Sequence, residues 1–146
     1  MCSAYAYVKD ILSYKRIFIL SPSHHVFLQN KCCISNCLEY DTIFGKLEVD
    51  TDLVREFERK AGFERMSYVM EVSENGLEMQ LPFISYLIEE QKHRQRTRLE
   101  KQRLEVRPSS NTNETPPSFT NSSSEDYDYS QPLLFPIVVG SLDSKH

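Results

Sequence analysis

The chain has 146 residues, of which 40% are hydrophobic, and a formal net charge of −4. This length suits one domain, and the net negative charge argues against a broadly basic nucleic-acid-binding protein. No apolar run reaches the ~18 residues that would span a bilayer. The N-terminus lacks a basic segment followed by an apolar run, so we expect no signal peptide and a location in the cytoplasm, extending to the nucleus.

The first part of the chain predicts a helix, a strand and a polar loop. Residues 1–14 carry apolar side chains at helical spacing and predict a short helix. Residues 16–20 form an apolar run typical of a buried strand, which leads into the polar loop 21–23. His24 and His25 follow this loop, and chemistry in α/β sheets sits just past the carboxyl ends of strands.

The next part predicts three short strands and one helix. The strands are expected at 32–34, 37–40 and 46–49, with Asp41 and Gly45 as turn residues between the last two. Residues 50–52 offer N-caps for a helix through about Ala61, and Gly62 is suited to end it in a left-handed conformation.

Two further elements are expected before the composition changes. Alternating apolar residues over 66–72 predict a strand that places Met66, Tyr68, Met70 and Val72 on one face. Residues 77–90 predict a helix, with Pro82 either in its first turn or at a kink in a longer helix.

The last third is polar until its final strand. Residues 91–107 hold seven Lys or Arg against two Glu, and we expect a solvated helical arm rather than a surface for nucleic acid or anionic membranes. Residues 108–131 have a biased composition that predicts a disordered insert. Tyr127 and Tyr129, which lie among acidic residues, are candidate phosphorylation sites there, with an unmodified linker as the alternative. Residues 133–139 predict a second buried strand, closed by Gly140.

These patterns divide the chain into three parts: a core at 1–90, the arm and insert at 91–131, and a returning strand and tail at 132–146. The cysteines do not have a recognised zinc spacing, and in a reducing compartment they are expected to remain thiols. A metal or redox role is the alternative for these residues, which are Cys2, Cys32, Cys33 and Cys37.

Several strings of the chain resemble, in order, those of the Memo family (mediator of ErbB-receptor-driven cell motility). They are KRIFILSPSHHVFL at 15–28, LEVD at 47–50, FERMS at 63–67, ENGLEMQLPF at 74–83 and FPIVVGSLDSK at 135–145. The resemblance implies an α/β fold related to class III, LigB-type non-haem iron dioxygenases. The chain corresponds to a middle portion of the family domain, so we expect a partial sheet with flanking helices.

The resemblance also implies a metal ligand. Family members build a metal site from a histidine of a His-Ala-Gly motif, the first histidine of the Ser-His-His loop and a distant cysteine. Only the second maps onto this chain, at His24, and the others are expected before Met1 and after His146. One ligand does not make a mononuclear iron or copper centre. We therefore expect no cofactor for this chain, and iron or copper in complete relatives.

The chain departs from the family pattern at two smaller points. Ser21 replaces a glycine, so a positive φ there would be strained. Asn75-Gly76 replaces a His-Ser pair, and Asn75 is suited to cap the following helix. Candidate binding residues beside His24 are His25, Asn75, Glu78 and Gln80. The alternative is that His24 and His25 are ordinary loop residues, and neither His93 nor His146 is expected near them.

Three functional hypotheses follow. The first is a Memo-like intracellular binding or signalling module in cell motility, without competent chemistry, whose partner is a phosphotyrosine-containing peptide or a signalling protein. The second is an iron- or copper-dependent redox enzyme related to class III dioxygenases, although fold analogy is weak evidence of reaction. The third is a truncated fragment without independent function, and its exposed strand edges would favour aggregation. We favour the first, and we expect no nucleic-acid partner.

Overall fold

A computed structural model describes residues 2–105 and 131–141 of the chain. Its elements, in chain order, are α1 (Cys2–Tyr5), the 3-10 helix η1 (Ile11–Ser13), β1 (Arg16–Pro22), β2 (Cys32–Ile34), β3 (Glu39–Thr42), β4 (Gly45–Glu48), α2 (Thr51–Ala61), β5 (Glu64–Arg65), α3 (Tyr68–Ser73), α4 (Asn75–Glu78), α5 (Leu81–Glu105) and β6 (Leu133–Val139). The expected α/β class is confirmed. The predicted insert lies outside the described residues, apart from Gln131.

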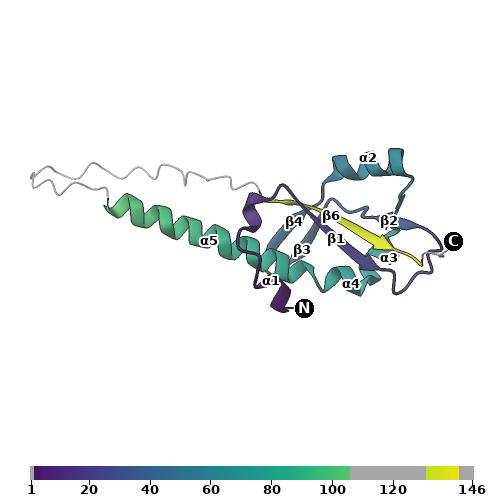
Figure 1. Ribbon diagram of the computed structural model, residues 1–146, viewed down its shortest axis with the longest axis horizontal. Helices are drawn as coiled ribbons and strands as arrows, with labels where there is room; N and C mark the ends of the chain where they lie inside the picture. Colours follow the sequence, from purple (N-terminus) through teal and green to yellow (C-terminus); the bar gives the residue numbers. More distant parts are fainter. Residues whose placement is uncertain (1, 106–130, 142–146) are drawn as a thin grey trace, which may run out of the picture.

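A four-stranded sheet in the order β1-β6-β2-β5 forms the centre of the structure (Figure 1). The last strand of the sequence, β6, lies inside the sheet: it runs parallel to β1 from Arg16↔Leu133 to Pro22↔Val139, and antiparallel to β2. The strands β3 and β4 pair as a separate antiparallel hairpin. The two predicted buried strands are therefore neighbours, although more than a hundred residues separate them in the sequence.

Helices cover both faces of the sheet, with α2 on one side and α4 and α5 on the other (Figure 1). On the α2 side, the rings of Phe57 and Phe135 lie 4.9 Å apart in a small cluster with Val54. The larger cluster joins Ile19 and Val138 of the sheet to buried residues of α5, such as Ile84. Burying these side chains supplies the main driving force for folding.

The sequence signals that bound the helices act as expected. The side chain of Asp50 caps α2 by accepting a hydrogen bond from the backbone N–H of Leu53, and Gly62 ends it at φ 67°. Pro82 is the second residue of α5, where its missing N–H leaves no intrahelical bond unmade. The buried residues of α5 end at Gln91, and the helix continues to Glu105 as the predicted arm.

Two predicted elements are wrong, and the helix predicted over 77–90 is divided between α4, which ends at Glu78, and α5, which begins at Leu81. Instead of one helix over 1–14, the described part of this segment has the short α1 and η1. Instead of a strand over 66–72, residues 68–73 form α3, because the Ser67 side chain accepts a hydrogen bond from the N–H of Met70 and caps a helix. Met66 and Met70 are both buried and are four residues apart, a spacing that also fits a helical face.

No helix in the described ranges has both the length and the apolar character needed to cross a bilayer. On the edge strand β1, the alternate side chains of Phe18 and Leu20 are 51% and 64% exposed, while Ile19 and Ser21 are buried. On the face of the sheet that α2 covers, the edge at β1 therefore exposes the apolar side chains of Phe18 and Leu20.

Candidate functional site

A pocket of about 480 Å³ lies where the end of β1 meets α4. Its lining comes from β1 and the loop that follows, with Leu20, Ser21, Pro22, His24 and His25, and from α4 and the turn after it, with Asn75, Gly76, Met79 and Gln80. Pockets of this size are typical of small-ligand sites. The sequence expectation that His24 and His25 follow the carboxyl end of β1 is confirmed.

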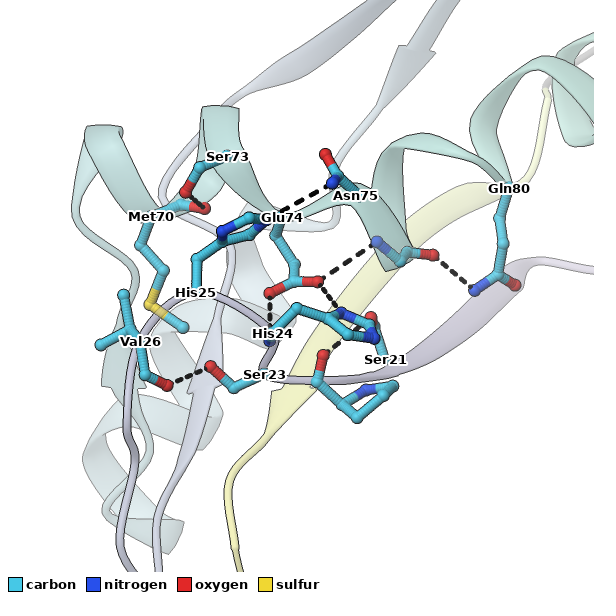
Figure 2. A network of polar contacts seen from close by, with 12 residues as sticks. Ser21, Ser23, His24, His25, Val26, Met70, Ser73, Glu74, Asn75 and Gln80 are labelled. Carbon is cyan, nitrogen blue, oxygen red and sulfur yellow. Dashed lines mark hydrogen bonds and ion pairs between the residues drawn. The ribbon is translucent and has the colours of Figure 1, made fainter.

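The carboxylate of Glu74 holds His24 in place (Figure 2). Its Oε1 lies 2.6 Å from Nδ1 of the imidazole, and its Oε2 accepts a hydrogen bond of 3.1 Å from the backbone N–H of His24. Glu74 is 1% exposed, whereas the His24 side chain is 49% exposed. A buried carboxylate therefore fixes the ring from within. Nε2, on the opposite side of the imidazole, is the nitrogen left for a ligand.

The electrostatics of Glu74 favour its ionised form. Burial would raise the pKa of this carboxyl group, but hydrogen bonds from the His24 ring and from the backbone N–H groups of His24 and Gly76 outweigh it. The pKa of Glu74 consequently lies below its ordinary value. Glu74 also serves as the N-cap of α4 by accepting from the Gly76 N–H at 3.2 Å. The expected capping role of Asn75 is therefore wrong, because Asn75 is the first residue of the helix.

Of the other candidate binding residues, His25, Asn75 and Gln80 line the pocket and Glu78 does not. Nδ2 of Asn75 lies 3.4 Å from Nε2 of His25 (Figure 2), and both residues line the pocket. Gln80 donates to the backbone carbonyl of Gly76 at 3.1 Å and accepts from the Tyr5 hydroxyl at 3.2 Å. Glu78 is exposed on α4 and does not line the pocket.

Two histidines were expected to lie away from the site. His93 is exposed on α5 and is not among the residues that line the pocket. His146 lies outside the described residues. The described imidazoles at the pocket are thus those of His24 and His25.

Ser21 adopts no strained backbone. Among the described non-glycine residues, the one with positive φ is Asn30, and Ser21 is an extended residue of β1. The condition under which strain was expected, a positive φ at position 21, is therefore not met. The constraint at this point is space, because a Cβ added to Gly76 would lie 2.2 Å from the Ser21 hydroxyl oxygen.

The residues near the pocket fit one metal ligand and do not fit a complete centre. An imidazole whose Nδ1 is held by a buried carboxylate, leaving Nε2 available, is the arrangement that metal-binding histidines use. Within residues 2–105 and 131–141, however, there is no group of three His, Cys, Asp or Glu side chains placed to hold a metal ion. No metal-dependent step is therefore derived for this chain.

A second buried carboxylate, Glu71 of α3, was missed by sequence reasoning. Its side chain accepts hydrogen bonds from the hydroxyls of Ser35 and Tyr40 and, at 2.9 Å, from the backbone N–H of Asn36. Burial, together with the charge of Glu71, raises the pKa of Tyr40 and raises that of Cys37 to about 11. This cluster fastens α3 to the segment after β2. A glutamate within an apolar run was the available signal.

Sequence comparisons with known proteins identify relatives of this chain. A sequence profile described as Memo-like protein matches residues 1–95. The chain is 37% identical over 91 residues to the MEMO1 family protein MHO1 of Saccharomyces cerevisiae. This alignment covers 58% of this chain and 27% of the relative. It is 43% identical over 84 residues to the Protein memo-1 homolog of Caenorhabditis elegans, with 57% and 24% covered. It is 38% identical over 92 residues to Protein MEMO1 of Homo sapiens, with 62% and 31% covered. The matched part thus spans about a quarter to a third of the length of these relatives.

Proposed function

The chain belongs to the Memo-like protein family, and we propose that it acts as a binding module in intracellular signalling linked to cell motility. Its partner in this proposal is a phosphotyrosine-containing peptide, bound at the pocket between β1 and α4. The cytoplasmic location, extending to the nucleus, that the sequence favours is part of the same proposal.

The observation that carries the proposal is the pairing of two imidazoles with apolar walls in one pocket. The ring of His25 can donate to a phosphate from Nδ1, since its Nε2 faces the amide of Asn75. The ring of His24, whose Nδ1 faces Glu74, donates to a phosphate from Nε2 in its protonated form, and the positive charge strengthens that bond. Met79 lines the same pocket and gives an aromatic ring apolar surface to contact. The hydrogen bonds that Glu74 accepts occupy its oxygens, which limits its repulsion of an anion.

Fluorescence anisotropy with one labelled peptide, in tyrosine and phosphotyrosine forms, tests this proposal. We expect the phosphorylated form to bind more tightly, and His24→Ala and His25→Ala to remove that preference. His93→Ala is the matched control, because His93 is an exposed histidine on α5 that does not line the pocket. Equal affinity for the two peptide forms would contradict the proposal.

A second candidate is an iron- or copper-dependent redox protein to which this chain contributes one ligand. The contact of 2.6 Å between His24 Nδ1 and Glu74 Oε1 favours it, because such a carboxylate orients a histidine ligand. When bound, the metal would supply redox chemistry, with His24 as the residue of this chain that holds it.

Anaerobic loading with Fe(II) or with Cu(II), followed by metal analysis of the desalted chain, separates the two candidates. The binding module predicts no stoichiometric retention. One retained ion per chain that is lost in His24→Ala would support the redox candidate instead.

A further inference from the structure

Ser21 of β1 and Gly76 of α4 meet behind the imidazole of His24. A Cβ added to Gly76 would lie 2.2 Å from Oγ of Ser21 and 2.9 Å from Cε1 of His24. Both separations are shorter than those found between real Cβ atoms and their neighbours. The contact therefore cannot hold side chains at both position 21 and position 76, and a Cβ at position 76 also crowds the ring of His24.

Neither side of this contact is free to move away. Ser21 is 2% exposed within β1, so its hydroxyl can turn only inside a packed environment. The backbone of Gly76 is fastened at both ends: its N–H donates to Glu74 Oε1 at 3.2 Å, and its carbonyl accepts from Gln80 Nε2 at 3.1 Å. A larger residue at position 76 would consequently displace the nearest group that has an exposed side, the ring of His24.

We infer that Ser21 and Gly76 form a coupled pair of positioning residues that sets where the imidazole of His24 stands against Glu74. Gly76 leaves the space that the Ser21 side chain fills. The two departures from the Memo pattern, a serine for a glycine at position 21 and a glycine for a serine at position 76, fall on opposite sides of this one contact. Serine and glycine have exchanged places across it, which conserves volume.

This exchange also changes the wall of the pocket. The hydroxyl at the contact comes from the strand β1 and not from the helix α4. It belongs to Ser21, whose Oγ donates to the carbonyl of Pro22 at 3.2 Å. On the helix side the wall beside His24 is bare backbone. The inference concerns the position of His24 and holds whatever ligand the pocket takes.

A double-mutant cycle in the full chain tests the coupling, using Gly76→Ala, Ser21→Gly and the double variant, with urea denaturation as the measurement. Gly76→Ala should lower the denaturation midpoint when Ser21 is present. In the Ser21→Gly background the same change should lower it much less or raise it, because alanine is the better helix former. Equal shifts in the two backgrounds would overturn the inference. If Gly76→Ala does not fold, folding of the double variant supports the coupling, and its failure to fold refutes it.

The imidazole signals of His24 in a ¹H–¹⁵N spectrum, assigned by their loss in His24→Gln, report its position directly. Gly76→Ala should shift these signals, and the exchange variant Ser21→Gly/Gly76→Ser should return them towards their original place. His25, whose ring nitrogen lies by Asn75, is the internal control and should shift less. Signals of His24 that stay in place in Gly76→Ala would refute the positioning role. A peptide titration of the same samples reports on the proposed function separately, so that either idea can fail alone.

Discussion

His24 Nδ1 and Glu74 Oε1 lie 2.6 Å apart although 50 positions separate the two residues in the sequence. This contact joins the loop after β1 to the start of α4. Because the same carboxylate also accepts from the backbone of His24 and of Gly76, one buried side chain fixes the loop, the imidazole and the helix.

Replacing Glu74 by glutamine should destabilise the chain by about 1–3 kcal/mol, since an amide keeps one acceptor and turns an NH₂ group towards N–H donors in a buried site. The free energy of unfolding in urea measures the loss. Glu78→Gln on the same helix is the control, and at this exposed position we expect a change within about 0.5 kcal/mol. Similar values for the two variants would show that Glu74 has no special role.

Acid should remove a contribution from Asp50. Burial would raise the pKa of this carboxyl group, but hydrogen bonds from Arg16 and the Leu53 N–H outweigh it and hold the pKa below 3.8. A carboxyl group whose pKa is lower in the folded than in the unfolded chain stabilises the fold at pH values above its unfolded-state pKa. This stabilisation is lost as the pH falls through its folded-state pKa. Asn is as good an N-cap as Asp, so Asp50→Asn isolates the charge.

The difference in unfolding free energy between the wild type and Asp50→Asn should therefore be largest near neutral pH and shrink below pH 3.8. Urea denaturation across this range measures it. A difference that stays constant with pH would show that the ionised carboxylate adds nothing.

Tyr40→Phe should cost about 1–3 kcal/mol, because it removes a hydroxyl that donates to the buried Glu71 and contacts Ser35 at 2.8 Å. Tyr68→Phe is a suitable control, since Tyr68 is 76% exposed. The measurement is the urea midpoint of each variant. Equal midpoints for the two would mean that water replaces the lost partner at Glu71.

The thiol of Cys37 should react slowly with iodoacetamide. Burial, followed by the charge of Glu71, raises its pKa to about 11, so the reactive thiolate is scarce near neutral pH. Peptide mapping by mass spectrometry gives its alkylation rate in the folded chain. We expect a faster rate in Glu71→Gln and in urea-unfolded protein. A rate in the native chain equal to that of the unfolded chain would contradict this.

The helices were predictable where local chemistry decides them. Asp50 and Gly62 mark both ends of α2. Pro82 allowed either a first turn or a kink, and the structure places it in the first turn of α5. The helix after Met66 was not predictable from spacing, because the apolar residues there alternate, as in a strand, and also lie four apart, as in a helix. The cap at Ser67 decides between these two patterns.

The features that the sequence did not predict depend on contacts between residues far apart in the chain. The position of His24 after β1 follows from the sequence, but its dependence on Glu74 requires the fold, since nothing local links a glutamate to a histidine 50 positions earlier. The same holds for Ser21 and Gly76, whose departures from the Memo pattern look independent in the sequence and lie in one contact in space.

The place of β6 between β1 and β2 governs the order in which this chain can fold on the ribosome. Among the described strands, β1 pairs with β6 alone, and Arg16 lies opposite Leu133, so this pairing cannot form until most of the segment between them has been synthesised. Pairings of such large sequence separation form slowly and leave apolar edges open meanwhile. During translation Ile19, which is buried in the folded chain, would thus stay open to solvent until β6 pairs with β1.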